Sequence, residues 1–233
     1  MASLQNKTVV VVGGSSGIGF AVALAALQSL ASAVIIASSN QARVSEAVER
    51  LKSHKLPGEV RGEVLDAKDS EAVKVFADGL GTVDHIVWTS GDVPGGSTGQ
   101  PAFPFSNVES VEQGQAVFSV RFWGPFILAK HAKFHPGGSM TLTAGLAGLR
   151  PRPGSPLASS VTTALDGLTR GLAVDLAPVR VNLINPGIID TEILDKLMGD
   201  KKETVVKVFI DKTILKRSGE PSEIAEAYLF LMK

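Results

Sequence analysis

Short runs of apolar and β-branched residues alternate along the whole chain with longer segments that we predict as helices. The first run, Thr8–Val12, is uninterrupted, and an unbroken run of this kind is expected of a strand buried on both faces of a sheet. The predicted strands are Thr8–Val12, Ala33–Ala37, Val60–Leu65, Val83–Thr89, Ser139–Thr143 and Val179–Ile184. The predicted helices are Gly17–Leu30, Gln41–Lys52, Ser70–Leu80, Val108–Phe134, Leu157–Leu176 and Pro221–Met232.

Proline and glycine mark the boundaries between these elements. Gly91–Pro104 and Leu149–Pro156 are rich in both residues and are predicted as loops. The long helix Val108–Phe134 is predicted to end at His135-Pro136-Gly137-Gly138, where proline and paired glycines stop a helix. Thr191–Leu215 is predicted to form an irregular helical lid.

Six strands, each followed by a helix or a long crossover, favour a parallel sheet with helices on both faces. We find no internal repeat and no linker that would mark a second domain. The sequence therefore predicts a single α/β domain over residues 1–233, a doubly wound parallel sheet of the Rossmann type.

Composition narrows the function classes. The chain has 233 residues, 44% of them hydrophobic, which suits one domain with a large core. Its 23 basic and 23 acidic side chains cancel, and this balance indicates neither a nucleic acid nor an anionic membrane as partner. Cysteine is absent, so disulfides are excluded and a reducing compartment is suitable. Met1–Lys7 does not resemble a secretory signal, and no apolar run reaches ~18 residues. We expect a cytoplasmic protein.

A glycine-rich turn joins the first strand to the first helix. Gly13, Gly17 and Gly19 stand directly between these two elements. Glycines permit a tight turn there and let the backbone approach a pyrophosphate, which then rests on the helix N-terminus. The alternative is a glycine-rich turn without a ligand, but the strand-turn-helix context favours dinucleotide binding.

The spacing Gly-x-x-x-Gly-x-Gly resembles that of the short-chain dehydrogenase/reductase family. Later segments agree with the resemblance: Asp66 after the third strand, Thr89-Ser90-Gly91 after the fourth, the run Val179 to Gly187, and Leu215 to Pro221 before the last helix. Residues that the turn or the resemblance assigns to the cofactor are Gly13, Ser15, Ser16, Gly17, Ile18, Gly19, Ser38, Ser39, Asn40, Arg43, Asp66, Thr89, Ser90, Gly91, Pro186, Gly187, Ile188 and Thr191. The family continues to a seventh strand, and whether one follows Lys233 is left open.

The end of the second strand indicates which dinucleotide binds. An acidic residue there would bind the ribose 2′-hydroxyl of NAD and repel a 2′-phosphate. This chain instead has Ser38, Ser39 and Asn40, with Arg43 one helical turn later. Hydroxyls, an amide and a guanidinium suit a phosphate, so we expect NADP(H). Arg43 could alternatively be a solvated helix residue.

The resemblance also locates four positions where the family carries an asparagine, a serine, a tyrosine and a lysine for proton transfer. Here they are Arg121, Gly145, Ala158 and Thr162. The only tyrosine, Tyr228, belongs to the last helix, which lies far from this cleft in the family arrangement. Thr143 is near the serine position and could hydrogen-bond a substrate, but its hydroxyl is too weak an acid to replace tyrosine.

Loss of a general acid typically costs ~10²–10⁴-fold in rate, so ordinary ketone reduction is disfavoured. Reduction of an iminium ion needs no proton donor. Arg121 is the candidate catalytic residue with Thr143, since a guanidinium could polarise a carbonyl, orient a carboxylate or hold an amide. It could equally pair with a carboxylate inside a helix interface. No metal site is expected, because His131 and His135 have no acidic or cysteine neighbour in sequence to complete one.

The leading hypothesis is an atypical NADP(H)-dependent oxidoreductase. Its expected substrate is a hydrophobic molecule with an activated C=N or C=C bond, as in alkaloid or other secondary metabolism, where relatives without the tetrad reduce imines and some guide a cyclisation. One alternative is an NADP(H)-binding sensor or scaffold without redox turnover. Another is a non-redox isomerase or cyclase that uses the cofactor as a pocket wall. The resemblance implies a homodimer or homotetramer formed through Val108–Phe134 and Leu157–Leu176.

Overall fold

A computed structural model describes residues 3–91, 108, 110–192, 194 and 202–233. The strands are β1 (Thr8–Val12), β2 (Ala33–Ser38), β3 (Glu59–Val64), β4 (Thr82–Trp88), β5 (Lys133–Thr143) and β6 (Arg180–Ile184). All pair in parallel, in the order β3-β2-β1-β4-β5-β6. The predicted doubly wound sheet is confirmed.

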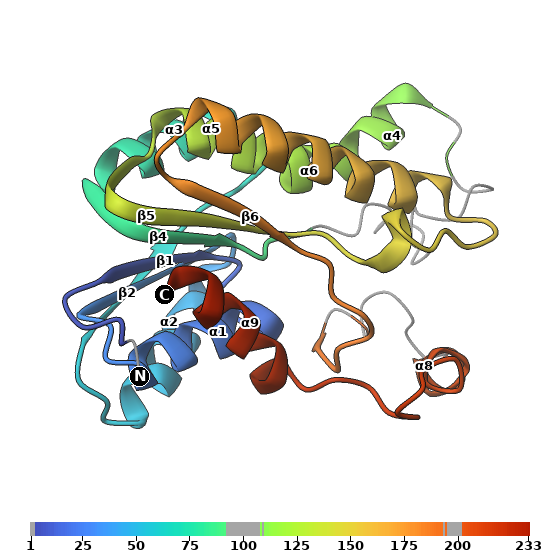
Figure 1. Cartoon of the computed structure of the whole chain (residues 1–233), viewed down its shortest axis with the longest axis horizontal. Coiled ribbons are helices and arrows are strands. Elements are labelled where there is room, and N and C mark those ends of the chain that lie inside the picture. The colour runs from blue at the N-terminus through green and yellow to red at the C-terminus, as the bar shows by residue number, and fades with distance from the viewer. Residues whose placement is uncertain (1–2, 92–107, 109, 193, 195–201) are drawn as a thin grey trace.

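Helices cover both faces of this sheet. One face carries α1 (Gly17–Gln28), α2 (Gln41–Ser53) and α9 (Pro221–Met232), and the other carries α3 (Ser70–Gly79), α5 (Gly124–His131) and α6 (Pro156–Asp175) (Figure 1). Two buried clusters match these layers: Val9, Val11 and Tyr228 belong to the first, and Leu142 and Leu165 to the second. Alternate residues of a strand therefore face different helix layers.

Local signals start several helices where the sequence predicts. Asn40 caps α2 by accepting a hydrogen bond from the Arg43 amide at 3.0 Å. Asp69 caps α3 by accepting from the amides of Glu71 and Ala72. Pro221 occupies the first turn of α9, where its missing N–H has no cost.

The predicted helix Val108–Phe134 is wrong at its end and in its continuity. The structure has α4 (Val111–Phe118), a π-helical turn η2 (Ser119–Trp123) and α5. β5 already begins at Lys133, which pairs with Thr82.

The proline and glycines that we predicted to stop a helix instead make a bulge inside β5. Phe134 pairs with Val83 and Ser139 pairs with His85, so His135 to Gly138 bulge out of the ladder. Gly137 has a positive φ of 80°, and a Cβ on Gly138 would lie 2.8 Å from the Asp84 carbonyl oxygen. The strand therefore continues on both sides of Pro136, which central strands tolerate at bulges.

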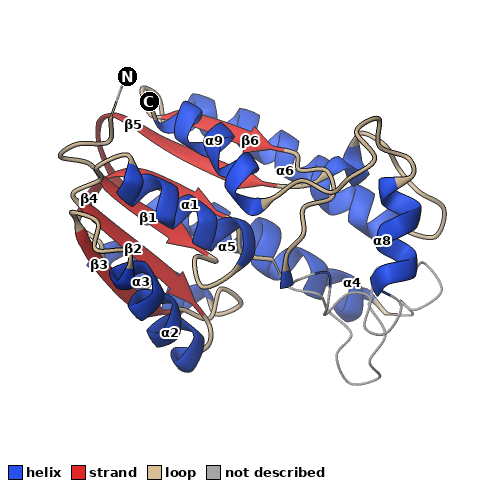
Figure 2. Cartoon of the chain, turned by 90° about the horizontal axis from the view of Figure 1, so that it is seen from below, coloured by secondary structure: helices blue, strands red, loops and turns tan. Residues whose placement is uncertain are grey.

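The predicted loop Leu149–Pro156 is confirmed except that Pro156 already belongs to α6. The predicted loop Gly91–Pro104 lies outside the described residues apart from Gly91. Of the predicted lid Thr191–Leu215, the structure describes α8 (Lys202–Ile210) and the flanking residues 191, 192, 194 and 211–215 (Figure 2). Among the helices of the described ranges, none combines the length and apolar character that a membrane span requires.

Candidate cofactor and substrate site

The glycine turn after β1 packs tightly against the end of β4. Gly13 and Gly17 have positive φ angles of 93° and 51°. A Cβ on Gly13 would lie 2.6 Å from both the Ser90 amide nitrogen and the Thr89 Oγ1 atom. A Cβ on Gly19 would overlap the Gly13 carbonyl oxygen. No residue with a side chain fits these positions without movement of the backbone.

The N-terminus of α1 offers its amides to a ligand. Its N-cap residue Ser16 is extended and makes no side-chain capping bond, and the first turn contains no acidic residue. Uncapped amides and the positive end of the helix dipole attract a phosphate. The residues present therefore fit the pyrophosphate of a dinucleotide.

Neighbouring strand ends complete this edge of the sheet. Thr89 and Ser90 follow β4, and their amides donate to the Val12 carbonyl at 2.8 and 3.0 Å. The Thr89 hydroxyl donates to the same oxygen at 3.1 Å. Asp66, after β3, is exposed, and its Oδ1 atom accepts from the Lys68 amide at 3.0 Å. The predicted cofactor residues from β1, β3 and β4 thus lie at the carboxyl edge, where open α/β sheets bind ligands.

The start of α2 presents exposed polar groups at the end of β2. Ser39, Asn40 and Arg43 are exposed, and the first turn of α2 has no acidic residue. The Asn40 side-chain oxygen is occupied by its capping bond, so its amide NH₂ group remains able to donate. These groups together with the helix N-terminus suit an anion.

The loop after β6 lies against the glycine turn. A Cβ on Gly17 would lie 3.1 Å from Cγ2 of Thr191. The Pro186 carbonyl accepts from the Leu146 amide at 3.2 Å, which joins this loop to the segment after β5. Thr191 thus lies beside the glycine turn, whereas Pro186 and Gly187 lie beside the segment after β5.

A hollow of about 350 Å³ opens at the same end of α1. Its lining residues are Gly17, Phe20, Ala21, Arg50, Asp190, Thr191, Glu192 and Pro221. The Arg50 guanidinium carbon lies 4.1 Å from the centre of the Phe20 ring, so this side chain walls the hollow by a cation–π contact. Gly17 and Thr191 place the hollow at the phosphate end of the site.

Three of the proton-transfer positions meet between β5 and α6. A Cβ on Gly145 would have Cγ2 of Thr162 as its nearest neighbour, at 3.9 Å. The Thr162 hydroxyl donates back to the Ala158 carbonyl at 2.8 Å and to the Ser159 carbonyl at 3.0 Å. Ala158 has only a methyl group, Gly145 has no side chain, and the Thr162 hydroxyl is bonded within its own helix. None of these three residues supplies an acid or a cation.

Arg121, the fourth position, projects toward the end of β4. It lies in the π-helical turn η2, and a Cβ on Gly91 would lie 2.6 Å from the Arg121 guanidinium carbon. The Trp88 indole Nε1 lies 3.1 Å from both the Ser90 and Val120 carbonyl oxygens and is placed to donate to them, so it ties η2 to the end of β4. Single π-helical turns occur frequently at functional sites. The structure thus places the Arg121 guanidinium at the carboxyl edge of the sheet, beside the predicted cofactor residues.

Thr143 does not face this site. Its Oγ1 atom lies 2.7 Å from the Tyr228 hydroxyl oxygen, on the face of the sheet that carries α9. Ala144, the next residue, packs with the cluster on the opposite face. The geometry therefore does not support Thr143 as a substrate contact, because its hydroxyl is engaged by Tyr228 beneath α9.

Tyr228 does not replace the missing acid either. Its side chain is fully buried beneath α9, and burial raises the pKa of its hydroxyl. The bond to Thr143 opposes this rise only in part. The lone tyrosine is therefore a structural residue of the α9 layer.

Sequence reasoning missed three features of this region. The tie from Trp88 to Val120 and the bond between Thr143 and Tyr228 join residues 32 and 85 positions apart. The Arg152 guanidinium carbon lies 3.5 Å from the centre of the Phe209 ring. Strand alternation could have indicated that Thr143 and Ala144 face opposite layers. Nothing in the sequence indicates the hydrogen bond from Trp88 to Val120 or the contact of Arg152 with Phe209.

Comparison with known proteins agrees with this arrangement. A sequence model of the SDR-like Rossmann domain matches residues 1–233. The short-chain dehydrogenase/reductase malC of Malbranchea aurantiaca is 34% identical over 244 residues, covering 99% of this chain and 89% of that protein. The short-chain dehydrogenase/reductase ucsE of an Acremonium species is 37% identical over 247 residues, covering 98% and 90%.

Solved structures share the fold along nearly the whole chain. The MalC reductase/Diels-Alderase from Malbranchea aurantiaca superposes with a TM-score of 0.84 at 33% identity, covering 98% of this chain and 91% of that one. A small-chain dehydrogenase in complex with NADPH superposes with a TM-score of 0.75 at 28% identity, covering 98% and 92%. The comparisons extend over all elements that build the site.

Proposed function

Because the chain belongs to the short-chain dehydrogenase/reductase family of oxidoreductases, we propose that it is an atypical NADP(H)-dependent reductase of a hydrophobic small molecule. Its acceptor is an activated C=N bond, as in an iminium ion, or an activated C=C bond. One observation carries this proposal. The glycine turn after β1 keeps the residues that suit a pyrophosphate, whereas the proton-transfer positions hold Arg121, Gly145, Ala158 and Thr162.

The absence of an acid at these positions selects the acceptor. A nicotinamide cofactor, when bound, supplies a hydride. Reduction of a ketone leaves an alkoxide that must take up a proton, and neither Ala158 nor Gly145 can give one. An iminium carbon accepts the hydride while the C=N electron pair moves onto nitrogen, so a neutral amine forms without proton transfer. The site then needs only to bind and orient its substrate.

Arg121 holds the polar end of the substrate in this proposal. Its guanidinium lies beside Gly91 at the cofactor edge and keeps its charge at all ordinary pH values. It would donate hydrogen bonds to a carbonyl or carboxylate oxygen of the substrate. For a conjugated C=C acceptor, the same cation would stabilise the enolate that forms when hydride adds, and water would then protonate the enolate carbon.

The start of α2 supports NADP(H) over NAD(H). Ser39, Asn40 and Arg43 are exposed at a helix N-terminus whose first turn has no acidic residue. A 2′-phosphate would receive donors there and meet no carboxylate in the first turn. The NADPH complex of a structural relative agrees with this assignment.

Small side chains at the tetrad positions leave room for a bulky substrate. Gly145 and Ala158 stand where the family carries larger polar residues, and Leu146 adds an apolar wall beside Gly187. We place the reaction in secondary metabolism. Since a relative is described as a reductase/Diels-Alderase, we further propose that this pocket guides a cyclisation after reduction.

The test uses purified protein, NADPH or NADH, and three substrate sets: cyclic iminium compounds, conjugated enones and simple ketones. The expected result is loss of the reduced-nicotinamide absorbance with iminium compounds or enones, faster with NADPH, and little with ketones. Ketone reduction at a rate typical of the family would contradict the proposal. Calorimetric binding of NADPH without turnover of any compound would favour a sensor or scaffold.

A second candidate function is a non-redox cyclase that uses the cofactor as a pocket wall. The name reductase/Diels-Alderase of a relative favours it, because a cycloaddition needs a shaped apolar pocket and no acid. The two candidates differ in one measurement. A reductase requires NADPH, whereas a cyclase forms product equally well with NADP⁺.

We also propose that two or four copies assemble through α4, α5 and α6. Trp123 of η2 and Phe126 of α5 are large apolar side chains with exposed fractions of 51% and 39%, and Val174 of α6 is 76% exposed. Phe118, Phe122, Trp123 and Phe126 form consecutive edge-to-face contacts. A contiguous apolar ridge of this kind is typical of a subunit interface.

A further inference from the structure

Two loops that are far apart in sequence meet beside the cofactor edge. Ile189, after β6, and Gly219, before α9, form a short parallel bridge. The Gly219 amide donates to the Ile188 carbonyl at 2.9 Å, and the Asp190 amide donates to the Gly219 carbonyl at 3.0 Å. Residues 188 to 190 are thus fixed by one glycine of the other loop.

This bridge bears on the cofactor because it adjoins the glycine turn. Thr191 follows it directly, and its methyl group packs against Gly17. The resemblance places Ile188 and Thr191 where the family contacts the nicotinamide amide and the phosphates. A shift of Gly219 would therefore be transmitted to the wall of the site through its two backbone hydrogen bonds to Ile188 and Asp190. An added Cβ at residue 219 would press on the Ile189 side chain, because it would lie 2.8 Å from Cδ1.

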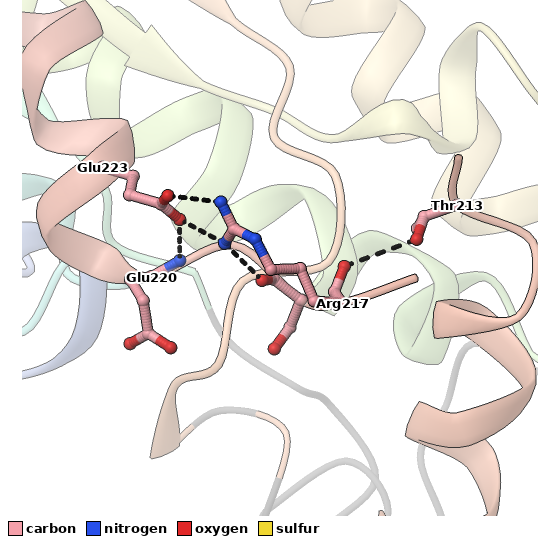
Figure 3. Close-up of polar contacts among 5 residues, drawn as sticks. Thr213, Arg217, Glu220 and Glu223 are labelled. Carbon is pink, nitrogen blue, oxygen red and sulfur yellow. Dashed lines mark hydrogen bonds and ion pairs between the residues drawn. The ribbon is translucent and has the colours of Figure 1, made fainter. Parts of the chain in front are cut away.

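Gly219 is itself held between the partners of an ion pair. Arg217 donates from Nη1 to Glu223 Oε2 at 2.7 Å and from Nη2 to Oε1 at 2.5 Å (Figure 3). Arg217 Nη1 also donates to the Ser218 carbonyl at 3.0 Å, and Glu223 Oε2 accepts from the Glu220 amide at 2.8 Å. The pair therefore clasps the backbone on both sides of Gly219.

The exposure of this pair indicates what it contributes. The side chains of Arg217 and Glu223 are 51% and 48% exposed, and exposed ion pairs stabilise proteins very little. Its geometry is nevertheless two-pronged and charge-assisted, which fixes direction as well as distance. The hydrogen bond from Arg217 lowers the pKa of Glu223 to about 2, so both groups stay charged above that pH. The pair thus suits positioning better than global stability.

We propose that Arg217 and Glu223 are positioning residues for the nicotinamide half of the cofactor site, acting through Gly219 on Ile188 and Asp190. This inference rests on the proposed dinucleotide function. It differs from a helix-capping role, because capping of α9 needs only one acceptor oxygen at residue 223, whereas the clasp needs the complete carboxylate and the complete guanidinium.

The variants separate these two roles. Glu223→Gln keeps an oxygen that can accept from the Glu220 amide and removes the charge and the second acceptor oxygen. Arg217→Lys keeps the charge and removes the two-pronged geometry. Glu71→Gln is the matched control, since it removes an exposed ion pair with Lys74 on α3, away from the site.

The experiment measures binding of NADPH and of 2′,5′-ADP by calorimetry in each variant. 2′,5′-ADP contains the adenosine half alone and should contact β2 and α2, not the bridge. We expect NADPH affinity to fall about tenfold in Glu223→Gln and Arg217→Lys, with 2′,5′-ADP affinity unchanged, and neither affinity to change in Glu71→Gln.

Equal partial losses for both ligands in a folded variant, or no loss for NADPH, would overturn the proposal. A thermal unfolding curve of each variant accompanies the titrations, and retained 2′,5′-ADP binding shows that a variant is folded. If a variant binds neither ligand, Gly219→Ala tests the same path through Ile189, and unchanged NADPH binding in it would also count against the proposal. Failure of the original chain to bind NADPH would instead reject the proposed function.

Discussion

The guanidinium of Arg121 lies beside Gly91, so closely that a methyl group at residue 91 would lie 2.6 Å from its central carbon. This contact joins the π-helical turn η2 to the end of β4. It fixes the only charged side chain among the four proton-transfer positions. The position of Arg121 can therefore be altered without changing Arg121 itself.

Gly91→Ala should displace the guanidinium and leave the fold intact. The displaced group is the far end of a flexible side chain, so the free energy of unfolding should change by less than ~1 kcal/mol. Turnover of an iminium substrate should fall by about 10²-fold, because small misplacements of an orienting group are costly. Stopped-flow assays and urea unfolding measure the two effects. Gly79→Ala on α3, with open space around it, is the control, and an equal loss there would contradict the explanation.

Restoring the acid should restore carbonyl chemistry. The triple variant Gly145→Ser, Ala158→Tyr and Thr162→Lys supplies the residues that the family uses. A serine fits at 145, since the nearest atom to its Cβ would be 3.9 Å away. We expect ketone reduction to rise by about 10²-fold or more, measured as NADPH consumption. The same variant with Phe at 158 controls for added volume, and an equal gain there would refute an acid role.

The sequence predicts the layers of this fold because each strand is an apolar run with turn residues at both ends. β1, β2 and α9 fall within one residue of their predicted bounds. The start of β5 could not be predicted, since Lys133-Phe134 becomes a strand only by pairing with Thr82 and Val83 across the sheet. Local propensity does not contain that pairing, and a bulge and a helix stop use the same proline and glycines.

The candidate site likewise has a part that the sequence predicts and a part that it does not. The cofactor edge is built from turns whose glycines are visible in the sequence, so Gly13, Gly17 and Thr191 converge as the motif implies. The direction of a side chain depends on the layer that its strand face meets. Thr143 was selected by its proximity in sequence to Gly145, yet it faces Tyr228 on the other side of the sheet.

Assembly should depend on the aromatic ridge of η2 and α5. We expect Trp123→Glu and Phe126→Glu to convert an oligomer into a monomer, because each places a charge in the apolar centre of the proposed interface. Light scattering after size-exclusion chromatography gives the molar mass directly. Val75→Glu on α3, which changes a side chain that is 71% exposed, should leave the mass unchanged. A monomeric original chain would rule out this interface.

The bond between Thr143 and Tyr228 should contribute stability without affecting the cofactor. Tyr228→Phe leaves the Thr143 hydroxyl without its partner, which should lower the free energy of unfolding by about 1–3 kcal/mol. The double variant with Thr143→Val removes both polar groups and should recover part of that loss. Urea unfolding of the four proteins forms a double-mutant cycle. A coupling energy near zero, or a loss of NADPH binding in Tyr228→Phe, would contradict this assignment.

Acid should weaken the fold through His85. This side chain is 2% exposed and its Nδ1 atom lies 2.9 Å from the Ser139 hydroxyl oxygen. Burial lowers the pKa of His85 from 6.5 to about 4; Asp84 opposes the shift, while Arg180 and Lys7 add to it. The unfolded chain, with an ordinary histidine pKa, then binds more protons than the folded chain between pH 6.5 and 4.

The His85 contribution to the free energy of unfolding should therefore be fully present above pH 6.5. As the pH is lowered to 4, the free energy of unfolding should fall by up to ~3 kcal/mol. Urea unfolding at about pH 7, 5.5 and 4.5 measures this decline. His85→Gln can still bond to Ser139 but has no proton to gain, so its stability should fall less than that of the original chain over the same interval. The Asp84 carboxyl does not confuse the comparison, because its pKa lies below its ordinary value of 3.8. A decline of equal steepness in His85→Gln would show that other groups cause the acid sensitivity.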